Sequence, residues 1–449
     1  MSLFAMNINN CRAGGAFLNA ERREKISHYV LIYVMIAMGD SFLYDCVLTQ
    51  LTPVIAVAAL FLVVLNRKTQ YVYPLSILGL GAFAMLFVRS TTGAMGPSEL
   101  LTWVSMICVT LLAVGFNISK FLERLIKLAT VLAIISAIAY FASLVVPGVW
   151  AHISIFSFPL TFGENYWVDS TTRVTTSYYQ AHGLLLYVDR GFDFERNVGI
   201  FREPAVYQIL LNSMIFVLLF MCPKSLENKR KKLIFLFVVV VLTTKSATGY
   251  LVTLILFFAY AVSFGGEGHK VSAVYPVLLS LGIVLLLLLM LFGNSSWFAD
   301  TVFGRFFSDE GFSMDASGSA RMGAANASMG LMMEYPFGCG YDVYSVALNM
   351  DITGYVAACL LKVAAVYGIP FGIAIVAWVF YPVFFKSRLS AAAKISFVLM
   401  YLLATYFENE VFYTTLIFIP IFIYLSSVQP KKNVGAARPD MIGGRFGTE

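Results

Sequence analysis

The sequence predicts an all-α, polytopic integral membrane protein with about a dozen transmembrane helices and two large loops on one side of the membrane. Three observations lead to this prediction. Hydrophobic residues make up 59% of the 449 residues and charged residues only 12%, which is more apolar surface than the core of a soluble domain can bury. The apolar residues fall into long runs, and the basic residues gather between alternate runs.

The candidate transmembrane helices are apolar runs with few or no charges, and most are long enough to cross about 30 Å of hydrocarbon. They cover residues 26–44, 47–65, 71–88, 100–116, 121–146, 204–222, 233–243, 249–264, 271–292, 355–385, 391–407 and 411–428. The polar N-terminal segment 1–25 lacks the layout of a cleavable signal peptide, so the first run is expected to remain as a signal anchor. We therefore expect a transmembrane domain over 26–428 and a polar C-terminal tail over 429–449.

The positions of Lys and Arg predict the orientation, because positively charged loops are retained in the cytoplasm. Most of the 31 basic residues fall on the cytoplasmic side if the N-terminus lies there, including the clusters at 120–127, 224–232 and 386–394. Both termini are then cytoplasmic, and the two long loops, 147–203 and 293–354, are extracytoplasmic. The net charge of +6 follows from this orientation, so no nucleic-acid partner is expected.

The two long loops are the places where a site is expected. Loops of this length are uncommon without structure and are usually functional. We expect them to contain short helices at the membrane surface. The six cysteines form no C-x-x-C pair, and the chain contains no P-loop, no H-E-x-x-H and no D-x-D motif. Neither a metal nor a cofactor is therefore expected.

The end of the first long loop, Arg190 to Pro204, carries the most informative pattern. Pro204 suits the first turn of a helix, whose N-terminus would direct free N–H groups and partial positive charge at the outer surface. Arg196 and Arg202 flank that position, which predicts a cradle for a phosphate or pyrophosphate. Alternatively, either arginine only pairs with a nearby carboxylate to hold the loop. These carboxylates are Asp193, Glu195 and Glu203.

A second pattern lies in the hairpin Thr243 to Gly249, between two apolar runs that are short for membrane spans. Lys245 and Ser246 are therefore expected within the depth of the outer leaflet, facing the protein interior. A cation there requires an anionic partner. The alternative is that Lys245 extends to the lipid headgroups.

A third pattern lies in the second long loop, where Arg321 precedes the segment Glu334 to Asp342. The Gly and Pro residues of that segment predict a tight backbone that approaches its neighbours closely. Arg321 is one of few cations in a loop rich in carboxylates, so it binds either a ligand or a structural partner.

Together these segments resemble the O-antigen polymerase and O-antigen ligase superfamily of bacterial surface polysaccharide assembly. The resemblance rests on R-x-x-G-x-F-x-E-P at Arg196 to Pro204, on the Lys-Ser-x-Thr-Gly hairpin at Lys245 to Gly249, and on Glu-x-Pro-x-Gly-x-Gly at Glu334 to Gly340. It extends to the order of helices and loops over most of the chain. Ligases of this superfamily typically carry a His just before the helix after the second loop. Residues 351–355 contain none, which favours a polymerase.

The resemblance implies a glycosyltransferase of the bacterial inner membrane. It would transfer a glycan from undecaprenyl pyrophosphate to a lipid-linked repeat unit at the extracytoplasmic face. The expected partners are undecaprenyl-pyrophosphate-linked glycans, membrane lipids, a chain-length regulator and a flippase. The implied pyrophosphate-binding residues are Arg196, Arg202, Arg321, Lys245 and Ser246. The candidate bases, in order of preference, are Glu203, Asp193, Glu195 and His182.

Two other functions remain open at the level of sequence. One is O-antigen ligase activity. The other, from a different class, is a lipid-linked oligosaccharide flippase, because such transporters have a similar helix count. Transporters place polar residues near the bilayer midplane, whereas the predicted spans here are nearly free of charge and the charges gather in the outer loops.

Overall fold

Helices dominate the part of the chain that the structure describes. The computed structural model describes residues 21–22, 24–33, 35–37, 39, 41–43, 118–146, 157–160, 167–168, 174–175, 179–182, 186–189, 196–201, 203–264, 316–348, 359–387 and 389–407. The predicted spans at 47–65, 71–88, 100–116, 271–292 and 411–428, and both tails apart from residues 21–22 and 24–25, lie outside these residues. The mostly helical character predicted from the sequence is confirmed for the described part.

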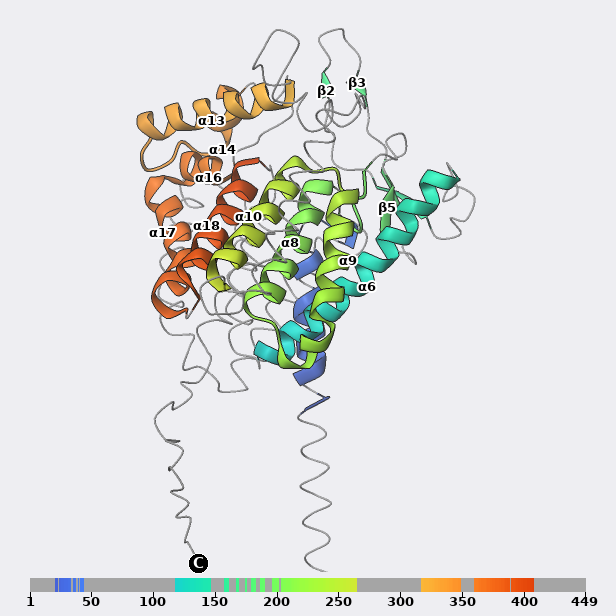
Figure 1. Ribbon diagram of the computed structural model, residues 1–449. Coiled ribbons are helices and arrows are strands. Elements are labelled where there is room, and N and C mark those ends of the chain that lie inside the picture. Colours follow the sequence, from blue (N-terminus) through green and yellow to red (C-terminus); the bar gives the residue numbers. More distant parts are fainter. Residues whose placement is uncertain are drawn as a thin grey trace, which may run out of the picture.

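A bundle of helices forms the centre of the molecule (Figure 1). Its members are α6 (Ile118–Val145), α8 (Pro204–Phe220), the short 3-10 helix η2 (Lys224–Lys229), α9 (Arg230–Thr243), α10 (Ala247–Phe264) and α18 (Ala391–Phe407). Helix α8 is mostly apolar and is buried along almost its whole length, as expected of a helix at the centre of a bundle. It packs against α9 and α10, and α10 packs against α18.

The predicted span 355–385 is not one continuous helix. It contains α16 (Cys359–Tyr367), α17 (Ile369–Tyr381) and the short π-helix η4 (Pro382–Lys386). The break between α16 and α17 lies at Gly368, which has a φ of +102°. Left-handed backbone of this kind suits glycine and ends a helix, and Pro370 follows in the first turn of α17, where its missing N–H costs no helical hydrogen bond.

The two long loops differ in their described parts. The second contains α13 (Ala316–Glu334) and α14 (Tyr341–Ala347), so the prediction of helices is confirmed there. The described parts of the first form short strands instead: β1 (Ser157–Leu160), β4 (Tyr179–His182) and β5 (Tyr187–Asp189) make an antiparallel sheet, and β2 (Trp167–Val168) pairs with β3 (Val174–Thr175). Aromatic and β-branched residues favour strands, and the helices predicted for this loop are not among its described residues; the rest of the loop lies outside them.

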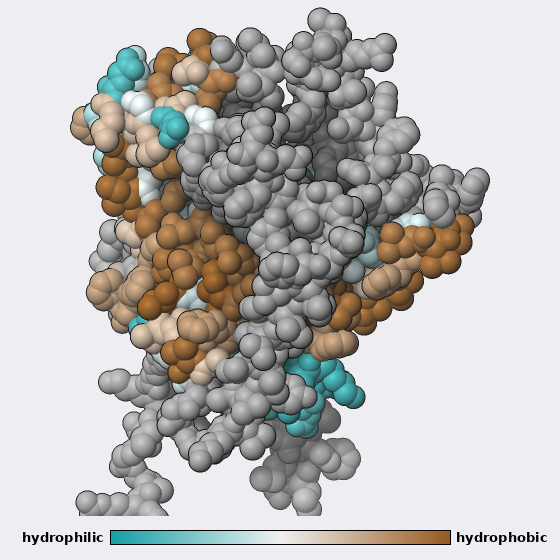
Figure 2. All heavy atoms as spheres, turned by 45° about the horizontal axis from the view of Figure 1, so that its top comes forward, coloured by the Kyte–Doolittle hydropathy of each residue, from teal (hydrophilic) through white to brown (hydrophobic). Residues whose placement is uncertain are grey.

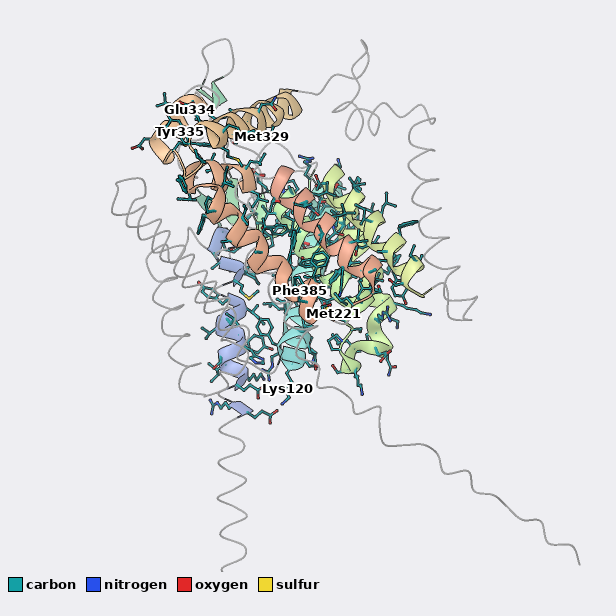
Figure 3. The ribbon with its side chains drawn as sticks, turned by 90° about the vertical axis from the view of Figure 1, so that its left-hand side faces the viewer. Lys120, Met221, Met329, Glu334, Tyr335 and Phe385 are labelled. Atoms are coloured by element: carbon teal, nitrogen blue, oxygen red, sulfur yellow. The ribbon has the colours of Figure 1, made fainter. Side chains whose placement is uncertain are left out.

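The described parts of both long loops lie at one end of the bundle. Helix α13 lies across that end above α16, and β2 and β3 lie at the same end (Figure 1). Glu334 and Tyr335, at the C-terminal end of α13, are far from Lys120 and Met221, which lie toward the opposite end (Figure 3). Because Met221 follows α8, the N-terminus of α8 points toward the end that carries the loops.

Large apolar side chains are exposed along the sides of the bundle, where Figure 2 shows hydrophobic residues gathered in broad areas. They include Ile138 on α6, Phe235 on α9 and Phe258 on α10. Among the described residues, one helix, Ser119–Val145, is long and apolar enough to cross a membrane alone. A second candidate arises only if α8 and Lys224–Thr243 are counted as one span bent by 109°. The apolar helices Thr248–Ser263 and Ala391–Thr405 are shorter.

Candidate functional site

The turn between α9 and α10 brings two predicted site residues, Lys245 and Ser246, into the protein interior. Lys245 ends α9 in a left-handed conformation, with a φ of +49°, at a position where glycine is usual. Its side chain is buried, with 9% of its surface exposed, and Ser246 is 6% exposed. The Gly249 N–H donates a hydrogen bond to Ser246 Oγ at 3.3 Å. Ser246 therefore satisfies one of the free N–H groups in the first turn of α10.

Arg196 contacts this turn directly. Its Nη2 donates a hydrogen bond to the carbonyl oxygen of Lys245 at 2.7 Å. The next residue, Asn197, is bound through both its backbone and its side chain: its N–H donates to the Thr243 carbonyl oxygen at 3.0 Å, and its Nδ2 donates to Thr243 Oγ1 at 2.9 Å. Two segments that the sequence singled out separately therefore form one unit.

Gly199 has a specific role in holding the Arg196 segment. Its φ is +60°, and a Cβ added there would lie 2.8 Å from Cε1 of Tyr207. Only glycine allows both this backbone conformation and this close approach of the ring. The Gly199 N–H donates to Asn197 Oδ1 at 3.0 Å, and its carbonyl accepts from the Val188 N–H at 2.7 Å. Phe201 stacks on the Tyr207 ring with centroids 5.7 Å apart.

Glu203 and Pro204 start α8 as predicted. Pro204 is the first residue of the helix, and Glu203 is the extended residue before it, whose carboxylate makes no capping hydrogen bond. The Glu203 carbonyl accepts from the Tyr207 N–H at 3.2 Å. The N-terminus of α8 and the capped N-terminus of α10 lie beside each other, since Gly249 in the first turn of α10 contacts Gln208 in the second turn of α8. Each contributes partial positive charge at its first turn.

A polar network joins α8 and α10 just inside these helix starts. Asn212 Nδ2 donates to Gln208 Oε1 at 2.8 Å and to the Gly249 carbonyl at 3.1 Å. Thr253 Oγ1 lies 2.7 Å from Asn212 Oδ1 and 2.8 Å from the Gly249 carbonyl. A Cβ at Gly249 would lie 3.0 Å from Cβ of Gln208. The glycine of the Lys-Ser-x-Thr-Gly hairpin is therefore explained by the close approach of α8.

The segment Glu334 to Gly340 has a different position. Its backbone docks on the break between α16 and α17: the Cys339 and Gly340 N–H groups donate to the carbonyls of Ala365 and Val366 at 2.9 and 3.1 Å, and the Ile369 N–H donates to Pro336 at 2.9 Å. Gly338 and Gly340 have φ values of +98° and +81°. The Gly and Pro pattern of this segment is therefore accounted for by docking of the backbone.

The other predicted site residues lie on different elements or outside the described residues. Arg321 lies on α13, which packs against α16 and α14. His182 ends β4 and pairs in register with Tyr187 of β5, the strand whose Val188 contacts Gly199. Asp193, Glu195 and Arg202 lie outside the described residues. The structure thus brings together Arg196, Lys245 and Ser246, close to the helix that Glu203 begins.

Gln208, Asn212 and Thr253 belong to the site but were not predicted from the sequence. Gln208 and Asn212 are four residues apart on α8 and so share one face of that helix. A pair of amides at this spacing in an otherwise apolar run could have predicted a polar site on α8, because buried polar side chains are costly unless they have partners.

The arrangement favours an oxygen-rich anion. The Arg196 guanidinium contacts the turn that carries Lys245, and this turn leads into the N-terminus of α10. Guanidinium groups, ammonium groups and helix N-termini all favour negative charge. Among the residues whose side chains are described, no group of His, Cys, Asp and Glu could hold a metal ion. No protein-family model, curated protein or solved structure matches the chain.

Proposed function

We propose that this chain is a polytopic membrane glycosyltransferase of the O-antigen polymerase type. It transfers a glycan from undecaprenyl pyrophosphate to a lipid-linked repeat unit on the extracytoplasmic side of the bacterial inner membrane. Both termini then lie in the cytoplasm, and a chain-length regulator and a flippase are the expected protein partners.

One observation carries this proposal: Arg196 hydrogen-bonds the carbonyl of Lys245 across 49 positions in the sequence. The first two segments on which the family resemblance rests therefore form a single cationic unit beside the start of α8. A lipid pyrophosphate is a good leaving group whose developing charge must be neutralised, which is what such a unit can do.

Two features support a membrane location. Large apolar side chains are exposed on α6, α9 and α10, and exposed apolar areas of this extent are typical of surfaces that contact lipid or another protein. The lysine- and arginine-rich connection Lys224–Lys232 follows Met221, toward the end of the bundle opposite α13 (Figure 3). This separation agrees with an orientation in which basic loops face the cytoplasm.

The proposed reaction is a displacement at the anomeric carbon of the donor glycan. The acceptor hydroxyl oxygen forms a bond to that carbon while the bond from the carbon to the pyrophosphate oxygen breaks. The electron pair leaves with undecaprenyl pyrophosphate, next to Arg196 and Lys245. The hydroxyl proton passes to a carboxylate, for which Glu203 is the described candidate because its side chain makes no capping hydrogen bond.

Deleting the gene and separating the surface polysaccharide on a gel tests this function. Loss of a polymerase leaves a single repeat unit on its anchor, and the intact gene supplied on a plasmid restores the polymer. Accumulation of lipid-linked polymer that is never transferred would instead indicate a ligase. Loss of both the single unit and the polymer, with lipid-linked units retained inside the cell, would indicate a flippase.

Labelling with an impermeant thiol reagent tests the orientation. In a variant that lacks the native cysteines, single cysteines placed at Asp169 and Ser317 should react in intact spheroplasts, and one placed at Lys229 should react only after lysis. Reaction at Lys229 from outside would overturn the orientation and the assignment of the site to the extracytoplasmic face.

A further inference from the structure

Gln208 is buried near the turn between α9 and α10 that carries Lys245. It lies in the second turn of α8, with 1% of its surface exposed. Its side chain packs against Gly249, the last residue of the Lys-Ser-x-Thr-Gly hairpin. The preceding residue, Tyr207, packs against Gly199 of the Arg196 segment. Gln208 therefore lies where the two segments of the site meet.

The polar network fixes the orientation of the Gln208 amide. Asn212 uses both hydrogens of its Nδ2, one on Gln208 Oε1 and the other on the Gly249 carbonyl. Asn212 is held in this orientation because the Gly249 carbonyl can only accept a hydrogen bond, so the Asn212 side-chain atom 3.1 Å from it is Nδ2. The oxygen of Gln208 is thus engaged as an acceptor, and its nitrogen is left to donate.

Gln208 Nε2 is buried and has no hydrogen-bond partner within the described part of the chain. Burying an amide donor without a partner is costly, and most buried polar atoms in proteins are satisfied. A methionine would fill the same volume without this cost. A ligand that supplies an acceptor at this position would remove the cost of the buried donor.

We propose that Gln208 Nε2 donates a hydrogen bond to an oxygen of the diphosphate group of the lipid-linked donor and forms the inner wall of its binding site. This inference rests on the proposed function, because it takes the diphosphate as the ligand of the Arg196 and Lys245 unit. The site selects an anionic oxygen over a sugar hydroxyl, since the surrounding cations and helix N-termini favour negative charge. Gln208 is then a substrate-binding residue on α8, a helix predicted from the sequence only as a membrane span.

Two substitutions of Gln208 test this role. Gln208→Glu keeps an oxygen for Asn212 and replaces the two donor hydrogens with an acceptor. Gln208→Met removes the amide at similar volume and remains informative if the glutamate variant does not fold. The matched control is Ser213→Ala on the same helix: Ser213 is also 1% exposed, and its Oγ is also without a hydrogen-bond partner among the described residues.

The measurement is the binding of farnesyl pyrophosphate and of inorganic pyrophosphate to the purified full chain in detergent. The rise in melting temperature with ligand concentration reports the binding. We expect the unaltered protein and Ser213→Ala to bind equally well. Both Gln208 variants should bind the two probes at least about tenfold more weakly, which is the effect expected when a hydrogen bond to a charged group is lost. Farnesyl pyrophosphate should bind more tightly than inorganic pyrophosphate if the site belongs to a lipid-linked diphosphate.

The outcomes separate this inference from the proposed function. If the unaltered protein binds farnesyl pyrophosphate and folded Gln208 variants bind it equally well, the role of Gln208 is overturned while the diphosphate site stands. If the unaltered protein binds neither probe, the diphosphate site and the role of Gln208 both fall. If Ser213→Ala weakens binding as much as Gln208→Met, the effect belongs to packing of α8 and the inference is also overturned.

Discussion

The hairpin Thr243 to Gly249 and the segment Glu334 to Gly340 both contain glycine, and the sequence marks both as parts of a site. In the first, Gly249 lets α8 approach closely enough for Gln208 to pack against the first turn of α10. In the second, the glycines allow backbone N–H groups to reach the carbonyls at the end of α16. One turn gathers polar side chains, whereas the other joins two pieces of backbone.

The difference teaches that a Gly and Pro pattern alone does not distinguish a ligand site from a docking contact. Both uses require the same local property, a backbone that can adopt unusual conformations or approach closely. What separates them is the chemistry that converges on the turn. Arg196 and Gln208 contact the first segment, which itself carries Lys245, and backbone hydrogen bonds account for the second.

The largest expected effect is at Arg196. Arg196→Ala should abolish polymer almost entirely, and Arg196→Lys should be strongly impaired, because lysine keeps the charge but loses the two-pronged fork that binds phosphate oxygens. Polymer length on a gel, compared with the level of membrane-inserted protein and its melting in detergent, measures the effect. A well-folded Arg196→Ala that still makes long polymer would contradict the assignment and direct attention to Arg321.

The second prediction concerns the docking segment. Gly368→Ala should lower the free energy of unfolding by about 2 to 4 kcal/mol, because the residue has a φ of +102° and an added Cβ would lie 2.7 Å from the Phe337 carbonyl carbon. Polymer should fall only in proportion to the folded protein that remains. Denaturation in detergent and activity per folded molecule are the two measurements.

Gly330→Ala is the control for that substitution. Gly330 lies in α13, and a Cβ there would meet nothing within 4 Å. Alanine should therefore raise the stability by about 0.5 to 1 kcal/mol, its advantage over glycine in a helix. Loss of activity per folded molecule in Gly368→Ala, with Gly330→Ala unaffected, would show that the docking segment also contributes to the site.

The third prediction separates the effect of the Lys245 backbone conformation on stability from the effect of its charge on activity. Lys245→Gly suits the left-handed conformation, so it should be about 1 kcal/mol more stable than Lys245→Ala, which keeps the strain. Both variants lose the cation and should make much less polymer. Full activity in Lys245→Gly would mean that Lys245 only terminates α9 and that its charge is not needed for the reaction. Melting and polymer length together measure the two roles.

The smallest expected effect is that of a chelator. Polymerisation by the purified protein should be unchanged in EDTA, because Arg196 and Lys245 supply the positive charge that a metal would otherwise provide. The rate of polymer formation with and without EDTA is the measurement. Recovery of a chelator-inhibited reaction on addition of magnesium or manganese would contradict this prediction.

The sequence by itself determined the features that arise from neighbouring residues. Pro204 marks the start of α8 because its fixed φ suits the first turn of a helix. The polar interruption at Thr243 to Ser246 marks the turn between α9 and α10. Helices in the second long loop were also predictable. Each of these follows from composition or spacing within a few residues.

The tertiary structure alone decided which distant residues meet. The carbonyl that Arg196 binds belongs to Lys245, and every residue has such a carbonyl, so no side-chain pattern points to it. The need for glycine at 199 comes from the Tyr207 ring, and the need at 249 comes from Gln208. Likewise, the free donor of Gln208 depends on partners in α10 that fix the amide orientation. These contacts arise from the packing of whole helices, which the spacing of residues along one chain segment does not encode.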